Sequence, residues 1–152
     1  MYSNSDIENT LQGSLIYVDN NEVLETVRRA YNDLEYASDA DIKEWFQSLS
    51  LDEQSSHVDY IKGLAFEDEV VRTLDTEGGM IFSNMSHPGT DIFLDNGQEF
   101  SVKSGTSLVP TREDMYEGLD VISTSEIAWD TGSIDAGYTN TALEFDVLDA
   151  LI

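Results

Sequence analysis

A predicted β-hairpin in the middle of this sequence carries two charged side chains of opposite sign. In the segment HPGTDIFLDNGQEFSVKSG, residues 87–105, Asp91 stands where a loop enters a strand, and Lys103 lies in the return strand after an apolar residue. The turn between them, Asp-Asn-Gly at residues 95–97, is a strong hairpin signal. Carboxylate oxygens hold hard cations such as Mg²⁺. The hairpin therefore carries a candidate metal ligand and, on its return strand, a positively charged side chain.

Both residues also have a purely structural interpretation. Asp91 follows Pro88-Gly89-Thr90 and could stabilise a turn through an Asx hydrogen bond. Lys103 could protect an exposed strand edge from pairing with other chains. The chain has only 7 Lys and Arg residues, so a lysine at this position is more informative than it would be elsewhere.

The segment resembles the signature of PD-(D/E)XK nucleases, and the predicted element order over residues 58–125 resembles the core of that family. The resemblance implies a restriction-endonuclease-like fold and Mg²⁺-dependent cleavage of nucleic acid. By the same resemblance, Asp91 is the first metal-binding carboxylate and Lys103 orients or activates the attacking water. Glu67, in the helix before the strands, matches the additional acidic residue that many members place there.

The sequence departs from the signature at the second carboxylate. Ser101 stands two residues before Lys103, where the family has Asp or Glu. One carboxylate is a weak cage for Mg²⁺, which is held by oxygen ligands. Glu99 lies two residues further back on the same face of a regular strand, about 6 to 7 Å away along it. The expected metal ligands are therefore Asp91 and Glu99.

The length of the hairpin loop decides whether these side chains share a face of the sheet. A two-residue turn at residues 96–97 would pair Asp91 with Val102 and point the carboxylate to the opposite face. A three-residue loop at residues 95–97, with its glycine left-handed, pairs Asp91 with Ser101 instead. The resemblance to a nuclease predicts the three-residue loop.

Glu67 adds an argument that does not depend on the hairpin. The residues at −7, −3, +4 and +7 from it are all apolar, which predicts a carboxylate on the buried stripe of a helix. A buried carboxylate needs a partner, and Lys103, a metal or a backbone donor would serve. A Glu67–Lys103 pair could belong to an active site or persist as the remnant of an inactive one.

Helical spacing and capping signals predict the helices of the chain. A capping box of Ser50 and Glu53 opens the longest of them. The predicted helices cover residues 20–37, 39–50, 51–75, 111–117 and 140–151.

Period-two patterns predict the strands, and residues 131–138 are expected to be a loop. The predicted strands cover residues 80–84, 90–94, 99–103 and 119–122. Together with the helices, they predict an α/β fold with a restriction-endonuclease-like core, α-β-β-β-α-β on a mixed sheet. We expect a single domain of 152 residues, formed by an N-terminal helical extension (1–50), a nuclease-like core (51–125) and a C-terminal loop and helix (126–152).

The charge of the chain opposes nucleic-acid binding. It carries 31 Asp and Glu against 7 Lys and Arg, a net charge of -24, and such a surface repels phosphate. The charge fits a solubilising surface from a salt-adapted source, a basic protein partner, or mimicry of a nucleic acid. Two functions therefore stand side by side. One is a weak or degenerate Mg²⁺-dependent nuclease acting on nucleic acid. The other is an inactive, nuclease-derived interaction protein that binds a basic partner as an inhibitor, a mimic or an assembly component.

The remaining sequence features exclude several classes of site. The chain has no cysteine, so disulfides and thiolate metal sites are excluded. It lacks a signal-peptide pattern and a run of about 18 apolar residues, so we expect a cytoplasmic or virus-derived intracellular protein with no membrane contact. Trp45, Phe46 and Trp129 are interpreted as core or partner-contact aromatics, because no basic groove accompanies them for stacking on bases.

Overall fold

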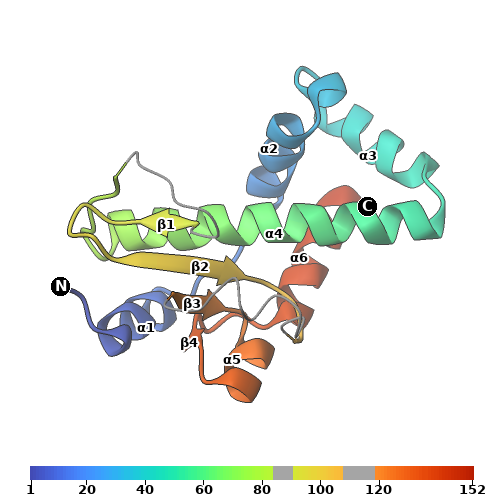
Figure 1. Ribbon diagram of the computed structural model, residues 1–152. Helices are drawn as coiled ribbons and strands as arrows, with labels where there is room; N and C mark the ends of the chain where they lie inside the picture. Colours follow the sequence, from blue (N-terminus) through green and yellow to red (C-terminus); the bar gives the residue numbers. More distant parts are fainter. Residues whose placement is uncertain (84–90, 108–118) are drawn as a thin grey trace. The chain divides into compact units, whose positions relative to one another are not determined.

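The computed structural model describes residues 1–83, 91–107 and 119–152. In this part of the chain it is a mixed α/β protein with six α-helices and a four-stranded mixed sheet (Figure 1). None of the described helices combines the length and the apolar content needed to cross a bilayer.

Two compact units make up the chain, each assembled from two separated stretches. The sheet unit comprises Met1–Ile16 and Glu67–Asn140, and the helical unit comprises Tyr17–Phe66 and Thr141–Ile152. These limits differ from the divisions after residues 50 and 125 that we expected. That the chain is a single domain stays a prediction.

The helical unit contains the helices that the sequence predicts best. It is formed by α2 (Asn20–Ala30), the 3₁₀ helix η1 (Asn32–Leu34), α3 (Asp39–Ser48), the first part of α4 (Leu51–Thr76) and most of α6 (Asn140–Leu151). The capping box that opens α4 is present, because Glu53 N–H donates to Ser50 Oγ and Ser50 N–H donates to Glu53 Oε1, both at 3.2 Å.

The first helix of this unit is shorter than the expected 20–37. Tyr31 adopts an extended conformation, with φ -121° and ψ 110°, which ends α2 at Ala30. Arg28 then holds the following segment, because its Nε donates to Ala37 O at 2.8 Å and its guanidinium pairs with Asp39. A chain fixed at both ends in this way turns back toward α3 instead of continuing as a helix.

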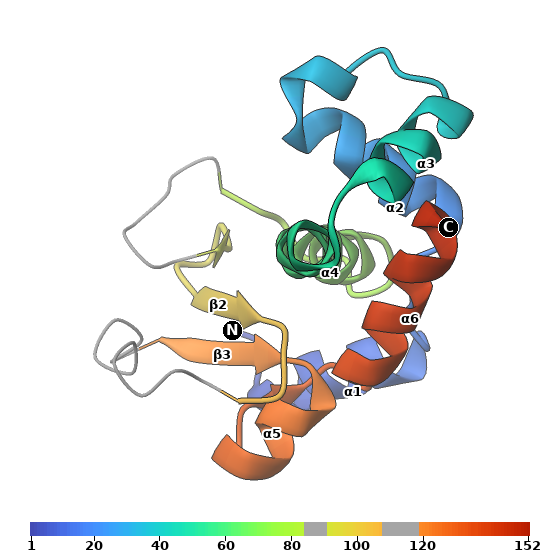
Figure 2. The same ribbon diagram turned by 90° about the vertical axis from the view of Figure 1, so that its right-hand side faces the viewer.

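The sheet unit is built on strands in the order β1-β2-β3-β4. The strands are β1 (Ile92–Phe93), β2 (Glu99–Lys103), β3 (Asp120–Ser123) and β4 (Ile134–Asp135). β1 pairs with β2 in antiparallel fashion, whereas β2, β3 and β4 are parallel neighbours. Figures 1 and 2 both draw the end of α4 next to the β1–β2 hairpin.

The β1–β2 hairpin has the three-residue loop that we expected. Ile92 pairs with Phe100, and Leu94 N–H donates to Gln98 O at 2.8 Å, so residues 95–97 form the loop. Gly97 is left-handed, with φ 93°. Asp91 departs from this regular register, because its own N–H donates to Phe100 O at 3.0 Å. Its side chain nevertheless reaches Ser101, which alternation places on the same face of β2 as Glu99 and Lys103.

An N-terminal helix, α1 (Asn4–Gly13), was not expected from the sequence. Its signal is a capping box in which Ser3 Oγ accepts from Asp6 N–H and Ser3 N–H donates to Asp6. Ile7 and Leu11, one helical turn apart, are fully buried. The helix is joined to β4, because Glu8 Oε2 accepts from Asp135 N–H at 3.1 Å.

The expectation of a loop over residues 131–138 was wrong. Helix α5 (Ser125–Thr131) reaches into this stretch, and β4 follows it as the last strand of the sheet. Ile134, Ala136 and Tyr138 are buried. This alternation is the period-two signal of a half-buried strand, which Gly137 and the shortness of the strand obscure.

Two other expected elements are shorter than predicted or cannot be assigned. The expected strand at residues 80–84 is represented by an antiparallel bridge between Phe82 and Leu94. The turn before Asp91 and the expected helix over residues 111–117 lie outside the described residues.

We predict that Gly97→Ala destabilises the sheet unit by about 1 kcal/mol, because an L side chain is strained in the left-handed region. No atom lies within 4 Å of the added Cβ, so the cost arises from the backbone alone. Gly13→Ala, at the end of α1, is the matched control. It also meets nothing within 4 Å and needs no left-handed conformation, so it is expected to be neutral or slightly stabilising. Urea unfolding followed by circular dichroism measures both. Equal effects would contradict the assigned turn.

Candidate functional site

Asp91 is tied to the neighbouring strand by its side chain. Its Oδ2 accepts hydrogen bonds from Val102 N–H at 2.8 Å and from Ser101 Oγ at 3.2 Å. Both donors belong to β2, ten and eleven residues along the chain. These two bonds to β2 therefore position the carboxylate, and neither of them uses Oδ1.

Ser101 occupies the place of the second carboxylate in the nuclease signature. It is fully buried at the centre of β2, and its hydroxyl donates to Asp91. A neutral donor here stabilises the single carboxylate across the hairpin. An acidic side chain at the same place would put two carboxylates side by side.

Glu67, on α4, is half-buried and not mostly buried as expected. The fully buried stripe of α4 in the sheet unit runs instead through Glu69, Val70, Thr73 and Leu74. The apolar residues around Glu67 in the sequence therefore mark the flank of the stripe and not its centre.

The electrostatic environment of Glu67 connects three of the predicted residues. Burial, followed by the negative charges of Asp91 and Asp68, raises the pKa of Glu67 to about 7, while Lys103 acts in the opposite direction. Glu67 therefore lies within electrostatic reach of both Asp91 and Lys103. The structure brings these three residues together on the face of the hairpin next to α4.

Lys103 is paired with β3 on one side of its strand, and the residues that would lie opposite it on the other side are outside the described part of the chain. It ends β2, which is hydrogen-bonded to β1 on one side and to β3 on the other, and it pairs in register with Ser123. Its backbone carbonyl accepts from Thr124 N–H at 3.2 Å. Whether Lys103 protects a strand edge on the β1 side therefore stays a prediction.

Glu99 stands apart from this group. It pairs with Phe93 near the loop end of the hairpin, four residues before Lys103, or about 13 Å along the strand. Its charge is not among those that shift the pKa of Glu67. Of the two acids that could complete the metal site with Asp91, the geometry favours Glu67 over Glu99.

The arrangement offers a cation two carboxylates and little more. Among residues 1–83, 91–107 and 119–152, no group of three or more His, Asp or Glu could hold a metal ion. Mg²⁺ needs six oxygen ligands but usually keeps several waters, so Asp91 and Glu67 fit a weak site completed by water and a substrate phosphate. Lys103 adds a positive charge beside this position.

Sequence reasoning missed a buried carboxylate two residues after Glu67. Glu69 is only 2% exposed and pairs with Arg72, whose Nε donates to Glu69 Oε2 at 3.1 Å. The (i, i+3) spacing of acid and arginine is the signal that could have found it. Arg72 neutralises the charge of Glu69 within α4, so we assign Glu69 a structural role.

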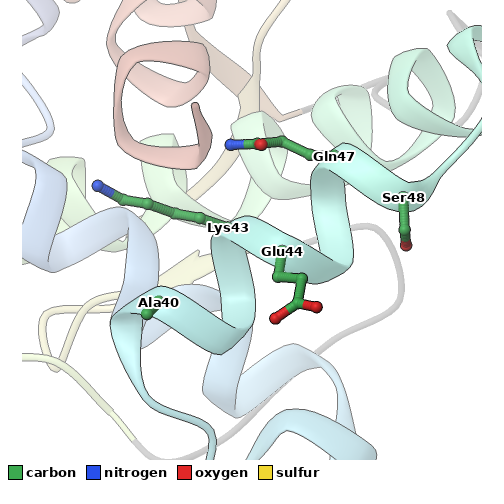
Figure 3. Close-up of a pocket in the computed structure, with 5 residues that line it drawn as sticks. All are labelled: Ala40, Lys43, Glu44, Gln47 and Ser48. Atoms are coloured by element: carbon green, nitrogen blue, oxygen red, sulfur yellow. The ribbon is translucent and has the colours of Figure 1, made fainter.

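A separate hollow of about 510 Å³ in the helical unit contains none of the predicted residues. Figure 3 shows that one helix, α3, supplies the side chains drawn there, with Lys43 and Gln47 pointing away from Glu44. The residues that line it are Ala40, Lys43, Glu44, Gln47 and Ser48. One acid and one base on a single helix provide neither a metal cage nor a nucleophile with its base.

No protein family, curated protein or solved structure matches this chain. The interpretation of the site therefore rests on its own geometry, which joins Glu67, Asp91 and Lys103. The resemblance to nucleases remains a matter of the short hairpin segment and the element order around it.

We predict that Glu67→Gln stabilises the metal-free protein at pH 8 and has little effect at pH 5. The folded pKa of Glu67 is raised, so folding favours the protonated side chain. Wild-type stability from this group is present below the unfolded pKa and is lost as pH rises toward and through about 7. Glutamine stays neutral and avoids this loss.

Urea unfolding between pH 5 and 8 measures the effect, with a chelator present. Asp75→Asn is the control, since it removes one negative charge from an exposed position on the same helix. A stability gain that grows with pH equally in both variants would contradict the assigned environment of Glu67.

Proposed function

We propose that this chain is a divalent-metal-dependent phosphodiesterase of the PD-(D/E)XK nuclease type that acts weakly on nucleic acid. The observation that carries the proposal is the approach of Glu67, Asp91 and Lys103 to one another from α4, the start of the hairpin and the end of β2. Two acids beside a lysine can hold a metal ion and orient a water for attack on a phosphodiester.

The element order supports the same proposal. Helix α4 precedes an antiparallel hairpin, and β3 lies parallel to β2 after an intervening segment. The nuclease core implied by the sequence resemblance has this order. The antiparallel bridge of Phe82 to Leu94 takes the place of its first strand.

Each residue would have a distinct role. Asp91, through Oδ1, and Glu67 would hold Mg²⁺, which when bound supplies a Lewis acid for the phosphoryl oxygen. Lys103 would hold the attacking water and offset the negative charge of the phosphate. Ser101 would keep Asp91 in place through its hydrogen bond to Oδ2.

The proposal includes low activity for two reasons. Ser101 supplies no carboxylate, so the metal site has one ligand fewer than the signature prescribes. The net charge of -24 also repels a polyanionic substrate. The same two facts favour a second candidate, an inactive interaction protein that binds a basic partner, and the experiments below separate the two.

We predict that wild-type protein cleaves DNA or RNA slowly and only with Mg²⁺ or Mn²⁺, and that Lys103→Ala lowers the rate by about a hundredfold or more. Glu67→Gln should have a comparable effect. Glu99→Gln, the matched control on the same strand, should retain wild-type activity. The assay uses single- and double-stranded substrates at several salt concentrations, because salt screens the repulsion.

Strong cleavage that survives Lys103→Ala would place the site elsewhere. Loss of activity in Glu99→Gln, but not in Glu67→Gln, would restore Glu99 as the second ligand.

We predict that Ser101→Asp destabilises the metal-free protein by about 2 to 4 kcal/mol, because it buries a second carboxylate beside Asp91. Mn²⁺ or Mg²⁺ should restore this stability and bind at least about tenfold more tightly than to the wild type, because the cation gains a ligand. Thermal unfolding and metal calorimetry measure the two effects. Ser101→Asn is the control, since it has nearly the same shape without the charge and should gain nothing from metal. An inert wild type, together with a Ser101→Asp variant that binds no metal, would favour the interaction protein.

A further inference from the structure

A cavity of about 500 Å³ lies in the helical unit, and none of the proposed catalytic residues lines it. The last residue of α2, the linking Tyr31 and the whole of η1 supply most of its lining, and α3 and α4 supply one aromatic side chain each. The lining residues are Ala30, Tyr31, Asn32, Asp33, Leu34, Trp45 and His57. Its volume is within the range of pockets that bind small ligands or single side chains.

Three rings that pack against one another form the apolar wall of this cavity. The centroid of the Tyr31 ring lies 5.2 Å from the centroids of both Trp45 and His57, and those two rings lie 5.1 Å apart. The Tyr31 hydroxyl also lies 2.7 Å from His57 Nδ1, which fixes the orientation of both rings. The three rings therefore support one another through ring contacts and this hydrogen bond.

These rings are not core residues in the usual sense. Phe46, the neighbour of Trp45, is 1% exposed, whereas Trp45, Tyr31 and His57 are all only half-buried. A group of half-exposed aromatic rings lining a hollow leaves ring surface open to a ligand. Aromatic rings attract cations over their faces, because the ring quadrupole is negative there.

The charges of the cavity select the same kind of ligand. Asp33 is an exposed acid in the lining, and no lysine or arginine lines the cavity. The segment of residues 31–41 carries four acids and no base. Burial also raises the pKa of Tyr31, so its hydroxyl stays neutral at physiological pH. Asp33 would repel an anionic ligand, and no lysine or arginine of the lining offsets that repulsion.

We propose that this cavity binds the side chain of a lysine or arginine from a basic protein partner. The ammonium or guanidinium group lies against the rings of Tyr31 and Trp45, and Asp33 pairs with it at the rim. The net charge of -24 supplies long-range attraction for such a partner. The site shares no residue with the proposed nuclease centre, so either can fail without the other.

The other hollow of the helical unit serves as an internal comparison. It carries its own cation, Lys43, and none of its lining residues is aromatic (Figure 3). It lacks both of the features that would select a cationic side chain. Peptide binding is therefore expected at the aromatic cavity and not on α3.

The test titrates the full chain with three blocked tripeptides, Gly-Lys-Gly, Gly-Arg-Gly and Gly-norleucine-Gly. Norleucine keeps the apolar stem of lysine and lacks the ammonium group. Two tryptophans are present, so Trp129→Phe, at a position 72% exposed, leaves Trp45 as the single fluorescent reporter. Backbone amide shifts of residues 32–34 provide an independent readout by NMR.

The lysine and arginine peptides should bind at least about tenfold more tightly than the norleucine peptide. Trp45→Leu, followed by NMR, should weaken binding by about fivefold to tenfold. Asp33→Asn should weaken it by about threefold. Glu35→Gln, the matched control, removes the same charge from an exposed position outside the lining and should leave binding unchanged.

Equal binding of the norleucine peptide would overturn the proposal, since the cavity would then be an ordinary apolar hollow. Equal weakening by Asp33→Asn and Glu35→Gln would also overturn it, because it would reveal only general attraction to an acidic surface. The Asp33 and Glu35 variants change exposed side chains, so their comparison decides the question even where Trp45→Leu does not fold.

Discussion

The length of one hairpin loop determines which side chains can act together in the sheet unit. Because side chains alternate along a strand, a loop shorter by one residue would turn Asp91 to the opposite face. The observed three-residue loop instead sets Asp91 against β2, where Ser101 and Val102 donate to a single carboxylate oxygen. The same register puts Lys103 on that face. Helix α4 then needs only to place Glu67 nearby for two acids and a lysine to meet.

Bringing Glu67 close to Asp91 costs electrostatic free energy, and the residue type at position 101 keeps this cost from rising further. Two carboxylates in a half-buried place repel each other, and the raised pKa of Glu67 records that repulsion together with burial. Ser101, where the nuclease signature has an acid, avoids adding a third negative charge. A cation would relieve the same repulsion. Such a site costs little stability without metal and binds metal weakly. Both properties fit a slow nuclease and also a protein that has lost nuclease activity.

Local signals predicted much of the fold, and features that depend on tertiary contacts escaped prediction. The hairpin, β2 and α6 were predicted nearly residue for residue, because turn chemistry and periodicity act over a few neighbours. Strand β4 was missed, since two residues beside a glycine carry little pattern. The half-burial of Glu67 could not be foreseen either. Apolar neighbours at helical spacing show which side of a helix is buried, but they do not distinguish the centre of that side from its flank. Glu67, Asp91 and Lys103 were named from the sequence. The preference for Glu67 over Glu99 as the partner of Asp91 could not be predicted from the sequence, because it depends on how α4 packs.

The central claim is that Glu67, Asp91 and Lys103 surround a divalent-cation site. Substoichiometric Mn²⁺ added to ¹⁵N-labelled protein tests it most directly, because the paramagnetic ion broadens amide signals close to where it binds. The account predicts that the amides of Asp91 and residues 101–103 broaden first, followed by those around Glu67, and that Mg²⁺ reverses the effect by competition. Broadening centred on Glu99, or spread evenly over the acidic surface with no preference for the hairpin, would contradict it.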